Sequence, residues 1–360
     1  MRYVITVSQI TPGGGLTKYV CSLCEILTSE SQNEVWIVAT HASKSNPTLE
    51  YLDRQGMVKL VNLGDYGKFR KYIQLARLLR KISPDVLIVN YNAPTQYVLP
   101  FLPKRIKTVH ILHSNTPDFY RVASINGKRT DVWIAPTPAL THYFDEYTSG
   151  AYTERIFTIP HGVEPPKNAP LKNKDIPQLT YVGVLYEHKG VKILPEIIKR
   201  LAAEGRKFHF TFIGEGILRG ELENELQTEI NNGLVEFTGR VSGDEVYRRL
   251  SETDIFVYPT HIDAFGLVIA EAMINEAVPV VTLLDGITDS IIDDGKNGYL
   301  TSQDNVTGFV EQILDLIDNQ ELLSKMSRNA AVKAREKFSI EKMKENYLAF
   351  FMKLTNVSKI

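Results

Sequence analysis

Short apolar runs alternate with amphipathic stretches along nearly the whole chain. The apolar runs predict strands at 2–8, 34–40, 57–63, 85–91, 106–112, 131–135, 179–185, 208–213, 234–238, 254–258, 278–282 and 298–301. Most of them are apolar at consecutive positions, as in 85–90. This pattern is typical of parallel strands that are covered by helices on both faces.

Helical periodicity fills most of the intervals between the predicted strands. The predicted helices are 15–29, 66–82, 138–147, 190–204, 217–230, 243–250, 267–275, 287–292, 304–318, 320–336 and 339–355. Between them, residues 164–178 contain four prolines among Lys and Asn, a composition that favours a hinge. We therefore expect an α/β protein of two Rossmann-like, doubly wound parallel-sheet domains, 1–163 and 179–338, facing a cleft where a ligand binds.

Bulk composition fits two soluble globular domains. The chain has 360 residues, 43% hydrophobic and 23% charged. It contains no stretch of 18 apolar residues, and its start is too short for a signal peptide, so we expect a cytoplasmic protein. The net charge of -1 gives no nucleic-acid signature. Residues 1–165 have a net charge of +5, and the remaining residues have a net charge of -6. This difference suggests that the first half meets an anionic surface or acceptor.

The two cysteines do not form a recognisable metal site. Cys21 and Cys24 lie three residues apart on a predicted helix, without a second Cys pair or a His cluster. Small core residues on one helix face are the more common role for such thiols, and a reducing compartment fits them.

The most informative segment runs from Asp263 to Met273, between two predicted strands. Gly266 allows a ligand to approach the backbone, and the start of a helix offers free amides to a phosphate. The amides concerned belong to Phe265, Gly266, Leu267 and Val268. Glu271 lies in an otherwise apolar helix, where sugar or ribose hydroxyls would be suitable partners for its carboxylate. A buried amphipathic helix with one capping carboxylate is the alternative.

Three glycine turns follow predicted strands and could present amides to an anion. The first ends in Gly14 and Gly15, the second begins at Gly183 and ends in Lys189-Gly190, and the third contains Gly214. Lys189 would place a positive charge on a phosphate beside the amides. A plain flexible turn and an ordinary surface lysine remain the alternatives.

One histidine and one missing motif complete the candidate chemistry. His113 follows the strand 106–112, where an imidazole in a cleft can polarise a leaving group. No Asp-x-Asp triplet occurs, so we expect no metal, and helix ends and Lys189 would have to offset the charge of a diphosphate.

The stretch 66–82 is a basic amphipathic helix. It could lie on an anionic lipid surface, although such helices more often pack their apolar face on their own sheet.

Together these segments resemble family 4 of the retaining glycosyltransferases, which have the GT-B architecture. The resemblance is densest from 178 to 301 and rests on Asp263, Phe265-Gly266, Glu271-Ala-Met273, Pro279-Val-Val281, Gly214-Glu-Gly216 and Phe237-Thr-Gly-Arg240. It implies that Glu271 binds the ribose of a nucleotide sugar and that Asp263 contacts the transferred sugar. The amides of 265–268 would hold sugar hydroxyls and phosphates.

Further matches extend the resemblance to the first domain. Gly14 and Gly15 match its glycine loop, and His113 matches the histidine that approaches the donor sugar. The final helix, within 339–360, is similar to the one that crosses back onto the first domain.

Three positions depart from the family pattern. The first carboxylate is Asp263 rather than Glu, Val184 replaces an arginine that binds the diphosphate, and His161 replaces an asparagine. Arg240 could substitute for the missing arginine.

The resemblance implies a retaining, metal-independent glycosyltransferase without a cofactor. We expect a nucleotide sugar donor, UDP-linked first and GDP-linked as the alternative, and a saccharide or lipid-linked acceptor. Bacterial surface polysaccharide or glycolipid synthesis at the inner face of the cell membrane would fit, and the oligomeric state stays open. The alternatives are a GT-B epimerase or phosphorylase, and a non-catalytic GT-B subunit that stabilises a partner enzyme.

Overall fold

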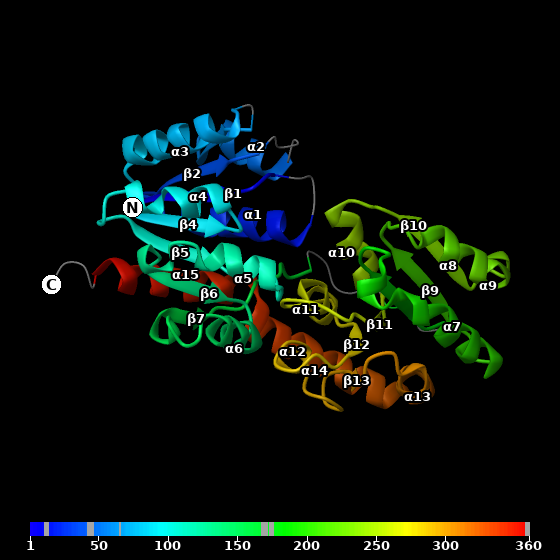
Figure 1. Cartoon of the computed structure of the whole chain (residues 1–360). Coiled ribbons are helices and arrows are strands. Elements are labelled where there is room, and N and C mark those ends of the chain that lie inside the picture. Colours follow the sequence, from blue (N-terminus) through cyan, green and yellow to red (C-terminus); the bar gives the residue numbers. More distant parts are fainter. Residues whose placement is uncertain (11–13, 42–46, 65, 167–171, 173–175, 357–360) are drawn as a thin grey trace. The chain divides into compact units, whose positions relative to one another are not determined.

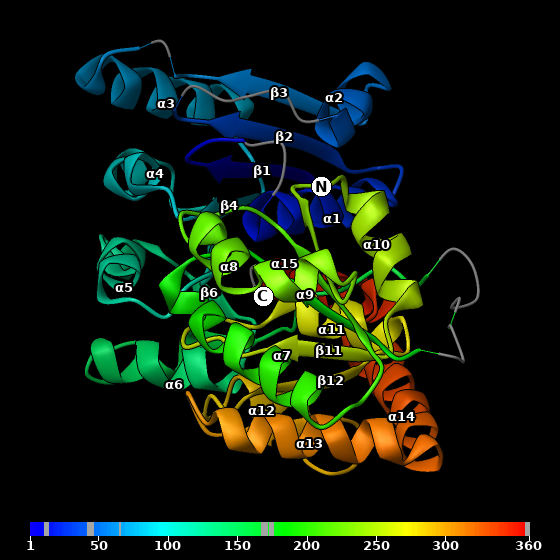
Figure 2. The same ribbon diagram turned by 90° about the vertical axis from the view of Figure 1, so that its right-hand side faces the viewer.

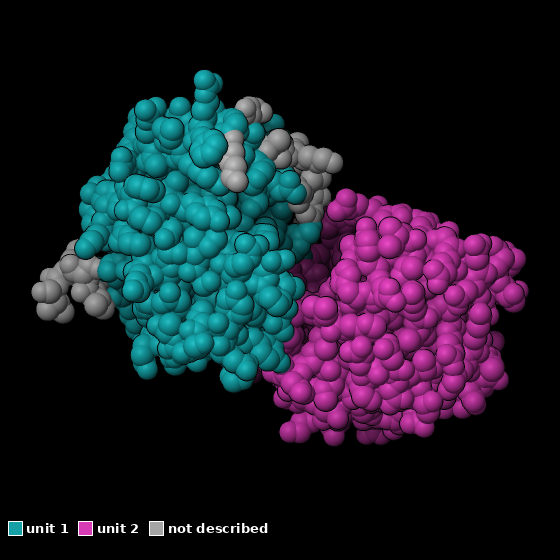
Figure 3. Space-filling view, in the orientation of Figure 1, with its two compact units in different colours: residues 1–162, 343–360 teal, residues 163–342 magenta. Residues whose placement is uncertain are grey.

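The chain divides into two compact units. The computed structural model describes all residues except 11–13, 42–46, 65, 167–171, 173–175 and 357–360. The first unit contains residues 1–162 and 343–360, and the second contains residues 163–342 (Figure 3). Most of the predicted hinge, 167–171 and 173–175, lies outside the described residues.

The first unit is built on a seven-stranded sheet in which every neighbouring pair is parallel. The strand order is β3-β2-β1-β4-β5-β6-β7; Figure 1 labels β2, β1 and β4 to β7, and Figure 2 labels β3 beside β2. The strands are β1 (Arg2–Val7), β2 (Glu34–Ala39), β3 (Val58–Asn62), β4 (Val86–Asn90), β5 (Lys107–Ile111), β6 (Val132–Ala135) and β7 (Ile156–Thr158). The order reverses between β1 and β4, which is where ligands bind in open sheets of this kind.

Seven helices of the described residues belong wholly or mostly to the first unit. They are α1 (Gly15–Thr28), α2 (Pro47–Arg54), α3 (Lys68–Ile82), α4 (Ala93–Val98), α5 (Pro117–Ser124), α6 (Pro138–Tyr147) and α15 (Ile340–Asn356). From Met343 onward α15 packs in this unit, where Tyr347 shares a 2.7 Å hydrogen bond with Tyr19. Phe351 also contacts Tyr3 of β1 edge to face, at 5.3 Å between ring centroids.

The second unit repeats the same plan with six parallel strands in the order β10-β9-β8-β11-β12-β13. The strands are β8 (Gln178–Val182), β9 (His209–Ile213), β10 (Val235–Gly239), β11 (Ile255–Tyr258), β12 (Val278–Thr282) and β13 (Tyr299–Thr301). The central strand β11 is completely buried, as its unbroken apolar sequence predicts.

Helices cover the second sheet and enclose one continuous apolar core. They are α7 (Leu194–Ala203), α8 (Arg219–Glu225), α9 (Gln227–Asn231), α10 (Gly243–Glu252), α11 (Leu267–Ile274), α12 (Thr288–Ile291), α13 (Val306–Asp318) and α14 (Gln320–Phe338). Helix α7 packs on α13, and α11 packs on α14 (Figures 1 and 2).

The predicted fold class is confirmed: two doubly wound, all-parallel α/β units follow one another along the chain. The predicted helix 217–230 is wrong in one respect, because it is two short helices, α8 and α9, that meet at Leu226. No helix in the described part of the chain combines the length and the apolar character needed to cross a bilayer.

Candidate functional site

The connection between β11 and α11 has the backbone geometry of a tight, glycine-dependent turn. Gly266 immediately precedes α11 and has a left-handed backbone, with φ of 82°. A Cβ atom at this position would also lie 2.6 Å from Cδ1 of Ile269. Only glycine meets both conditions without strain, so the turn that starts α11 depends on it.

The Asp263 carboxylate lies at the centre of this turn and accepts five hydrogen bonds. Its Oδ1 atom accepts from three backbone amides, those of Ala264 (2.8 Å), Phe265 (3.4 Å) and Gly266 (3.0 Å). Its Oδ2 atom accepts from the Lys189 ammonium and from the Tyr258 hydroxyl, each at 2.9 Å. The side chains of Lys189 and Asp263 are only 16% and 18% exposed, so solvent weakens this ion pair little.

These contacts fix the protonation state of the carboxylate. Burial alone would raise the pKa of Asp263, but the Lys189 ammonium, the Ala264 amide and the Tyr258 hydroxyl together outweigh burial and lower it. The pKa of Tyr258 is raised well above its usual value, first by burial and then by the charge of Asp263. Near neutral pH the carboxylate is therefore ionised, and the tyrosine is a neutral hydrogen-bond donor.

Lys189 reaches Asp263 from a second glycine turn. Gly190 has φ of 66°, and a Cβ atom there would lie 1.7 Å from the carbonyl oxygen of Pro259. The Lys189 ammonium also donates to the carbonyl of Ile262 (3.1 Å) and lies 5.4 Å from the centre of the Tyr258 ring. An ammonium has three hydrogens. Two are used here, and no described residue accepts the third.

The start of α11 supplies further positive groups beside this ammonium. In the part of the chain that the structure describes, no acceptor pairs with the amides of Leu267 and Val268, and both residues are partly exposed. The first amides of a helix carry its positive dipole end. By contrast, the amides of Phe265 and Gly266, which the sequence offered as free donors, already bond to Asp263.

The ends of β8, β9 and β10 form the neighbouring part of the same sheet edge. The amide of Gly183 donates to Ile213, and the amide of Gly214 donates to Gly239. A Cβ atom on Gly214 would lie 1.9 Å from the carbonyl oxygen of Gly183, so the two chains can meet only because this residue is glycine. Arg240 follows β10 directly and is exposed, two strands away from β8, and it makes no ion pair with the described residues.

Glu271 lies one helical turn into α11 and is 6% exposed. Its backbone carbonyl accepts a hydrogen bond from the side-chain Nδ2 of Asn275 (2.8 Å). The structure thus places Glu271 on the helix whose start carries the candidate anion-binding amides.

The first unit carries the remaining predicted residues at the edge of its own sheet. Gly14 precedes α1 with φ of 97°, and Gly15 is its first residue. A Cβ atom at either position would meet no described atom within 4 Å. Residues 11–13 of this turn lie outside the described residues.

His113 lies in a group of aromatic rings after β5. Its Nε2 atom pairs with Oδ1 of Asn90 at the end of β4 (2.8 Å), and Tyr19 of α1 contacts the ring at 4.8 Å. Burial, and then the neighbouring His161 and His110, lower the pKa of His113 well below its usual value. The imidazole is therefore neutral at physiological pH.

The structure brings Lys189, Asp263, Phe265 and Gly266 into direct contact, and it brings Gly183 and Gly214 together beside them. His113, Gly14 and Gly15 belong to the other unit. Tyr258 was missed. The sequence does place this tyrosine at the end of a predicted buried strand. Because a buried tyrosine hydroxyl usually has a hydrogen-bond partner, this position could have indicated a role beside the site.

The positive groups at this edge are an ammonium and backbone amides. Among the described residues, no three His, Cys, Asp or Glu side chains come together as ligands for a metal ion. Cys24 is buried in the core, as predicted, whereas Cys21 is only half-buried. Burial raises the pKa of both thiols, that of Cys21 to about 12.

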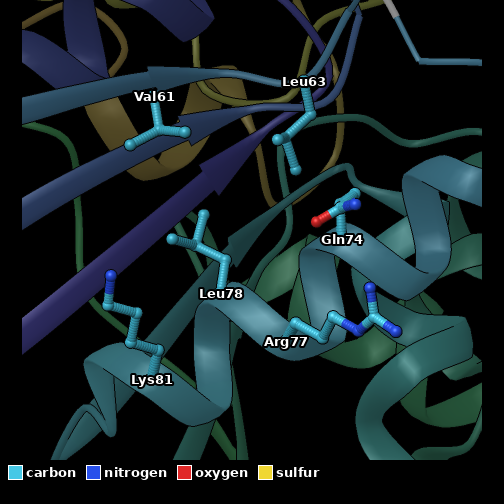
Figure 4. A pocket seen from close by; sticks show the side chains of 6 residues that line it. All are labelled: Val61, Leu63, Gln74, Arg77, Leu78 and Lys81. Atoms are coloured by element: carbon cyan, nitrogen blue, oxygen red, sulfur yellow. The ribbon is translucent and has the colours of Figure 1, made fainter.

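A shallow cavity of about 220 Å³ lies in the first unit between β3 and α3 (Figure 4). Its apolar lining comes from Val61, Leu63 and Leu78, with Gln74, Arg77 and Lys81 on the helix beside them. The same helix exposes 81% of Phe69 and 51% of Ile73. Part of its apolar surface therefore does not pack on the sheet.

Two family models match adjacent parts of the chain. Glycosyltransferase Family 4 matches residues 13–166, and Glycosyl transferases group 1 matches residues 164–333. The chain belongs to the family 4 glycosyltransferases with the GT-B fold.

The relatives and solved structures agree with this placement. An uncharacterized glycosyltransferase of Methanocaldococcus jannaschii is 28% identical over 91% of this chain and 92% of its own length. The capsular polysaccharide biosynthesis glycosyltransferase CapM of Staphylococcus aureus is 26% identical over 44% of this chain and 41% of its own.

Two structures of other proteins share the fold over nearly their whole length. One is a TarM mutant of S. aureus in complex with fondaparinux, α-GlcNAc-glycerol and UDP (TM-score 0.77, 16% identity, 99% of both chains). The other is HepE of Anabaena in complex with UDP-glucose (TM-score 0.77, 17% identity, 98% of this chain and 100% of that one).

Proposed function

We propose that this protein is a retaining, metal-independent glycosyltransferase that moves a sugar from a nucleoside diphosphate to an acceptor hydroxyl. The observation on which this rests is the Lys189 ammonium, with one hydrogen unused, beside the open amides of Leu267 and Val268. These groups can bind the two phosphates of the donor. They offset the charge that develops on the diphosphate as it leaves, which is usually the largest contribution to catalysis.

The chemistry of transfer follows from what surrounds the leaving group. The bond between the anomeric carbon and the distal phosphate oxygen breaks, and the acceptor oxygen bonds to the same face of the sugar. The acceptor proton passes to the departing phosphate oxygen. Support for this route is that Asp263, the carboxylate nearest to Lys189, has both oxygens engaged by protein donors and is poorly suited to act as a covalent nucleophile.

The remaining predicted residues receive roles around the donor. Glu271 binds the ribose hydroxyls, and the backbones at Gly183 and Gly214 lie against the nucleotide. Arg240 supplies charge where Val184 replaces the usual arginine. From the first unit, the neutral His113 contacts the donor sugar, and the Gly14 and Gly15 backbone faces the phosphates.

A UDP-sugar is the favoured donor and a GDP-sugar the alternative. Two proteins of this fold bind UDP or UDP-glucose, which supports the first. A relative named for capsular polysaccharide biosynthesis supports a saccharide or lipid-linked acceptor in bacterial surface polysaccharide or glycolipid synthesis.

The location that fits these substrates is the cytoplasm, at the inner face of the cell membrane. Helix α3 supports peripheral contact with an anionic membrane, because exposed Phe69 and Ile73 lie on a helix that also carries Arg70, Arg77 and Lys81.

A thermal-shift panel of UDP, GDP and their common sugar conjugates tests the proposal. A ligand at 100 times its dissociation constant adds about 2.7 kcal/mol to the free energy of unfolding. We expect one nucleotide series to raise the melting temperature and Lys189→Met to abolish the increase. If no nucleotide or nucleotide sugar stabilises the wild-type protein, the proposal fails and a non-catalytic subunit is favoured. Conversion of the donor without an acceptor would indicate an epimerase.

A further inference from the structure

Tyr91 combines a strained backbone with a partly exposed ring directly after β4. Its φ is 42°, in the left-handed region that bulky residues rarely adopt. Among the described residues it is the only aromatic one with such a backbone. Strain of this kind costs free energy and gathers at functional sites. The conformation of Tyr91 therefore points to a role other than the stability of the fold.

Contacts with two neighbouring elements hold Tyr91 in this conformation. Its carbonyl oxygen accepts a hydrogen bond from the hydroxyl of Ser8, which directly follows β1 (2.6 Å). Its ring stacks on Phe119 of α5, with 4.5 Å between the centroids and 10° between the planes. Phe119 is 5% exposed, so it gives the tyrosine ring a fixed support. The strand order reverses between β1 and β4, so Tyr91 lies where ligands bind in open sheets.

Part of the Tyr91 side chain is left for a ligand. The residue is 37% exposed although its ring is stacked on Phe119. In the part of the chain that the structure describes, no second ring contacts it and no group pairs with its hydroxyl. A tyrosine ring is apolar on its face and polar at its tip. It therefore suits a ligand that has both characters.

The chain beside Tyr91 carries polar groups from the neighbouring strands. The Ser8 hydroxyl lies at the Tyr91 backbone, and the Ser8 carbonyl accepts from the amide of His41 near the end of β2 (2.7 Å). Gln9 and His41 are both exposed. An acyl chain would find little apolar surface among these groups. A pyranose ring has C–H groups on its faces and hydroxyls at its edge, so it can stack on Tyr91 and bond to polar groups nearby.

Phe119 also connects Tyr91 with His113. The rings of Phe119 and His113 meet edge to face, with 6.3 Å between their centroids. The proposed function places His113 beside the donor sugar. Because Tyr91 and His113 both contact Phe119, a ligand that stacks on Tyr91 lies close to His113. This is where an acceptor hydroxyl has to be for transfer.

We propose that Tyr91 is the platform on which the acceptor binds, and that the acceptor is a saccharide whose pyranose ring stacks on the exposed part of the tyrosine ring. The assignment rests on the proposed function, because it needs a sugar to be transferred beside His113. It narrows the acceptor class, since the unit that meets the protein here is a sugar ring and not a lipid chain.

The test compares Tyr91→Phe, which keeps the ring, with Tyr91→Leu, which keeps an apolar side chain without a flat face. The donor is the nucleotide sugar that stabilises the wild-type protein most. The acceptor probes are the methyl pyranosides of glucose, galactose, mannose and N-acetylglucosamine. We expect Tyr91→Leu to raise the KM for the methyl glycoside about tenfold, and Tyr91→Phe to raise it by a smaller factor. The KM for the donor should be unchanged in both variants.

Two further variants make the comparison specific. Tyr91→Asn also removes the ring, but asparagine tolerates a left-handed backbone, so this variant should fold and match Tyr91→Leu. Tyr97→Leu is the matched control. Tyr97 lies on α4 in the same unit, is 46% exposed, and its ring contacts that of Tyr72 at 5.9 Å between centroids. Its replacement should leave the KM for the methyl glycoside unchanged.

The outcomes distinguish the two proposals. Wild-type protein that binds neither UDP nor GDP overturns the proposed function and this assignment with it. Wild-type protein that binds a nucleotide but transfers sugar to none of the methyl glycosides overturns the saccharide assignment alone, and transfer to a polyprenyl phosphate would then identify a lipid acceptor. An unchanged KM for the glycoside in Tyr91→Leu, or an equal rise in Tyr97→Leu, overturns the platform role of Tyr91.

Discussion

Replacement of Asp263 by Asn should destabilise the second unit strongly. Asn retains one oxygen for the amides of 264–266, but it presents an NH2 group to Lys189 and Tyr258, which are both donors. The ammonium then loses its counter-ion in a place where its side chain is 16% exposed. Breaking a buried pair by removing one partner typically costs about 3–5 kcal/mol.

The size of this effect can be expressed as a melting temperature. For a domain of 150–250 residues, 1 kcal/mol corresponds to roughly 2–4 °C. We therefore expect Asp263→Asn to lower the melting temperature of the second unit by roughly 6–20 °C, from the pair cost above. Because the pKa of Asp263 is lowered in the folded state, its stabilising contribution is present above the ordinary value of 3.8 and is lost as the pH falls below it.

The assay is urea unfolding and calorimetry of wild type and variant between pH 3 and 7. Asp318→Asn is the matched control, since Asp318 pairs with Arg206 at 2.8 Å but both side chains are more than 40% exposed. A surface pair of this kind contributes about 0–1 kcal/mol. If Asp263→Asn costs no more than Asp318→Asn, or if its cost does not shrink at low pH, the reasoning is wrong.

Three further predictions concern other positions. In urea unfolding, Gly190→Ala should lower the free energy of unfolding more than Gly205→Ala does. Both glycines have positive φ, but only a Cβ atom at residue 190 would meet a described atom, the Pro259 carbonyl oxygen at 1.7 Å. Equal losses in the two variants would contradict this. Burial lowers the pKa of His110 to about 3, so stability should fall by about 1.4 kcal/mol per pH unit as the pH drops below 6.5. His110→Asn should remove this part of the slope and leave the contribution of His113, whose pKa is also lowered; an unchanged slope would rule out His110. Glu271→Gln should weaken UDP and uridine binding equally in calorimetry, because both contain ribose; a loss for UDP alone would place Glu271 at the phosphates instead.

Parallel strands could be predicted closely because both of their faces are buried. The predicted strand 85–91 is β4 (Val86–Asn90), and 278–282 is β12 (Val278–Thr282). Helices α2, α4 and α5 were not predicted. Each has only six to eight residues and starts at or beside a proline, too short to show a clear helical period.

The candidate site could be predicted residue by residue but not as a set of contacts. Glycine at positive φ and lysine beside a glycine turn leave a signal in the sequence, so Gly266 and Lys189 could be found. The bonds among Tyr258, Asp263 and Lys189 could not, because 74 residues separate Lys189 from Asp263 and only the parallel sheet brings them together. For the same reason, the pairing of His113 with Asn90 became visible only in the structure.

A crystal structure of the protein with bound UDP tests the central claim most directly. We predict the distal phosphate within about 3 Å of the Lys189 ammonium and of the amides of Leu267 and Val268, with the bonds between Tyr258, Asp263 and Lys189 intact. Density for UDP at another place, with these groups still open to solvent, would contradict the proposed site.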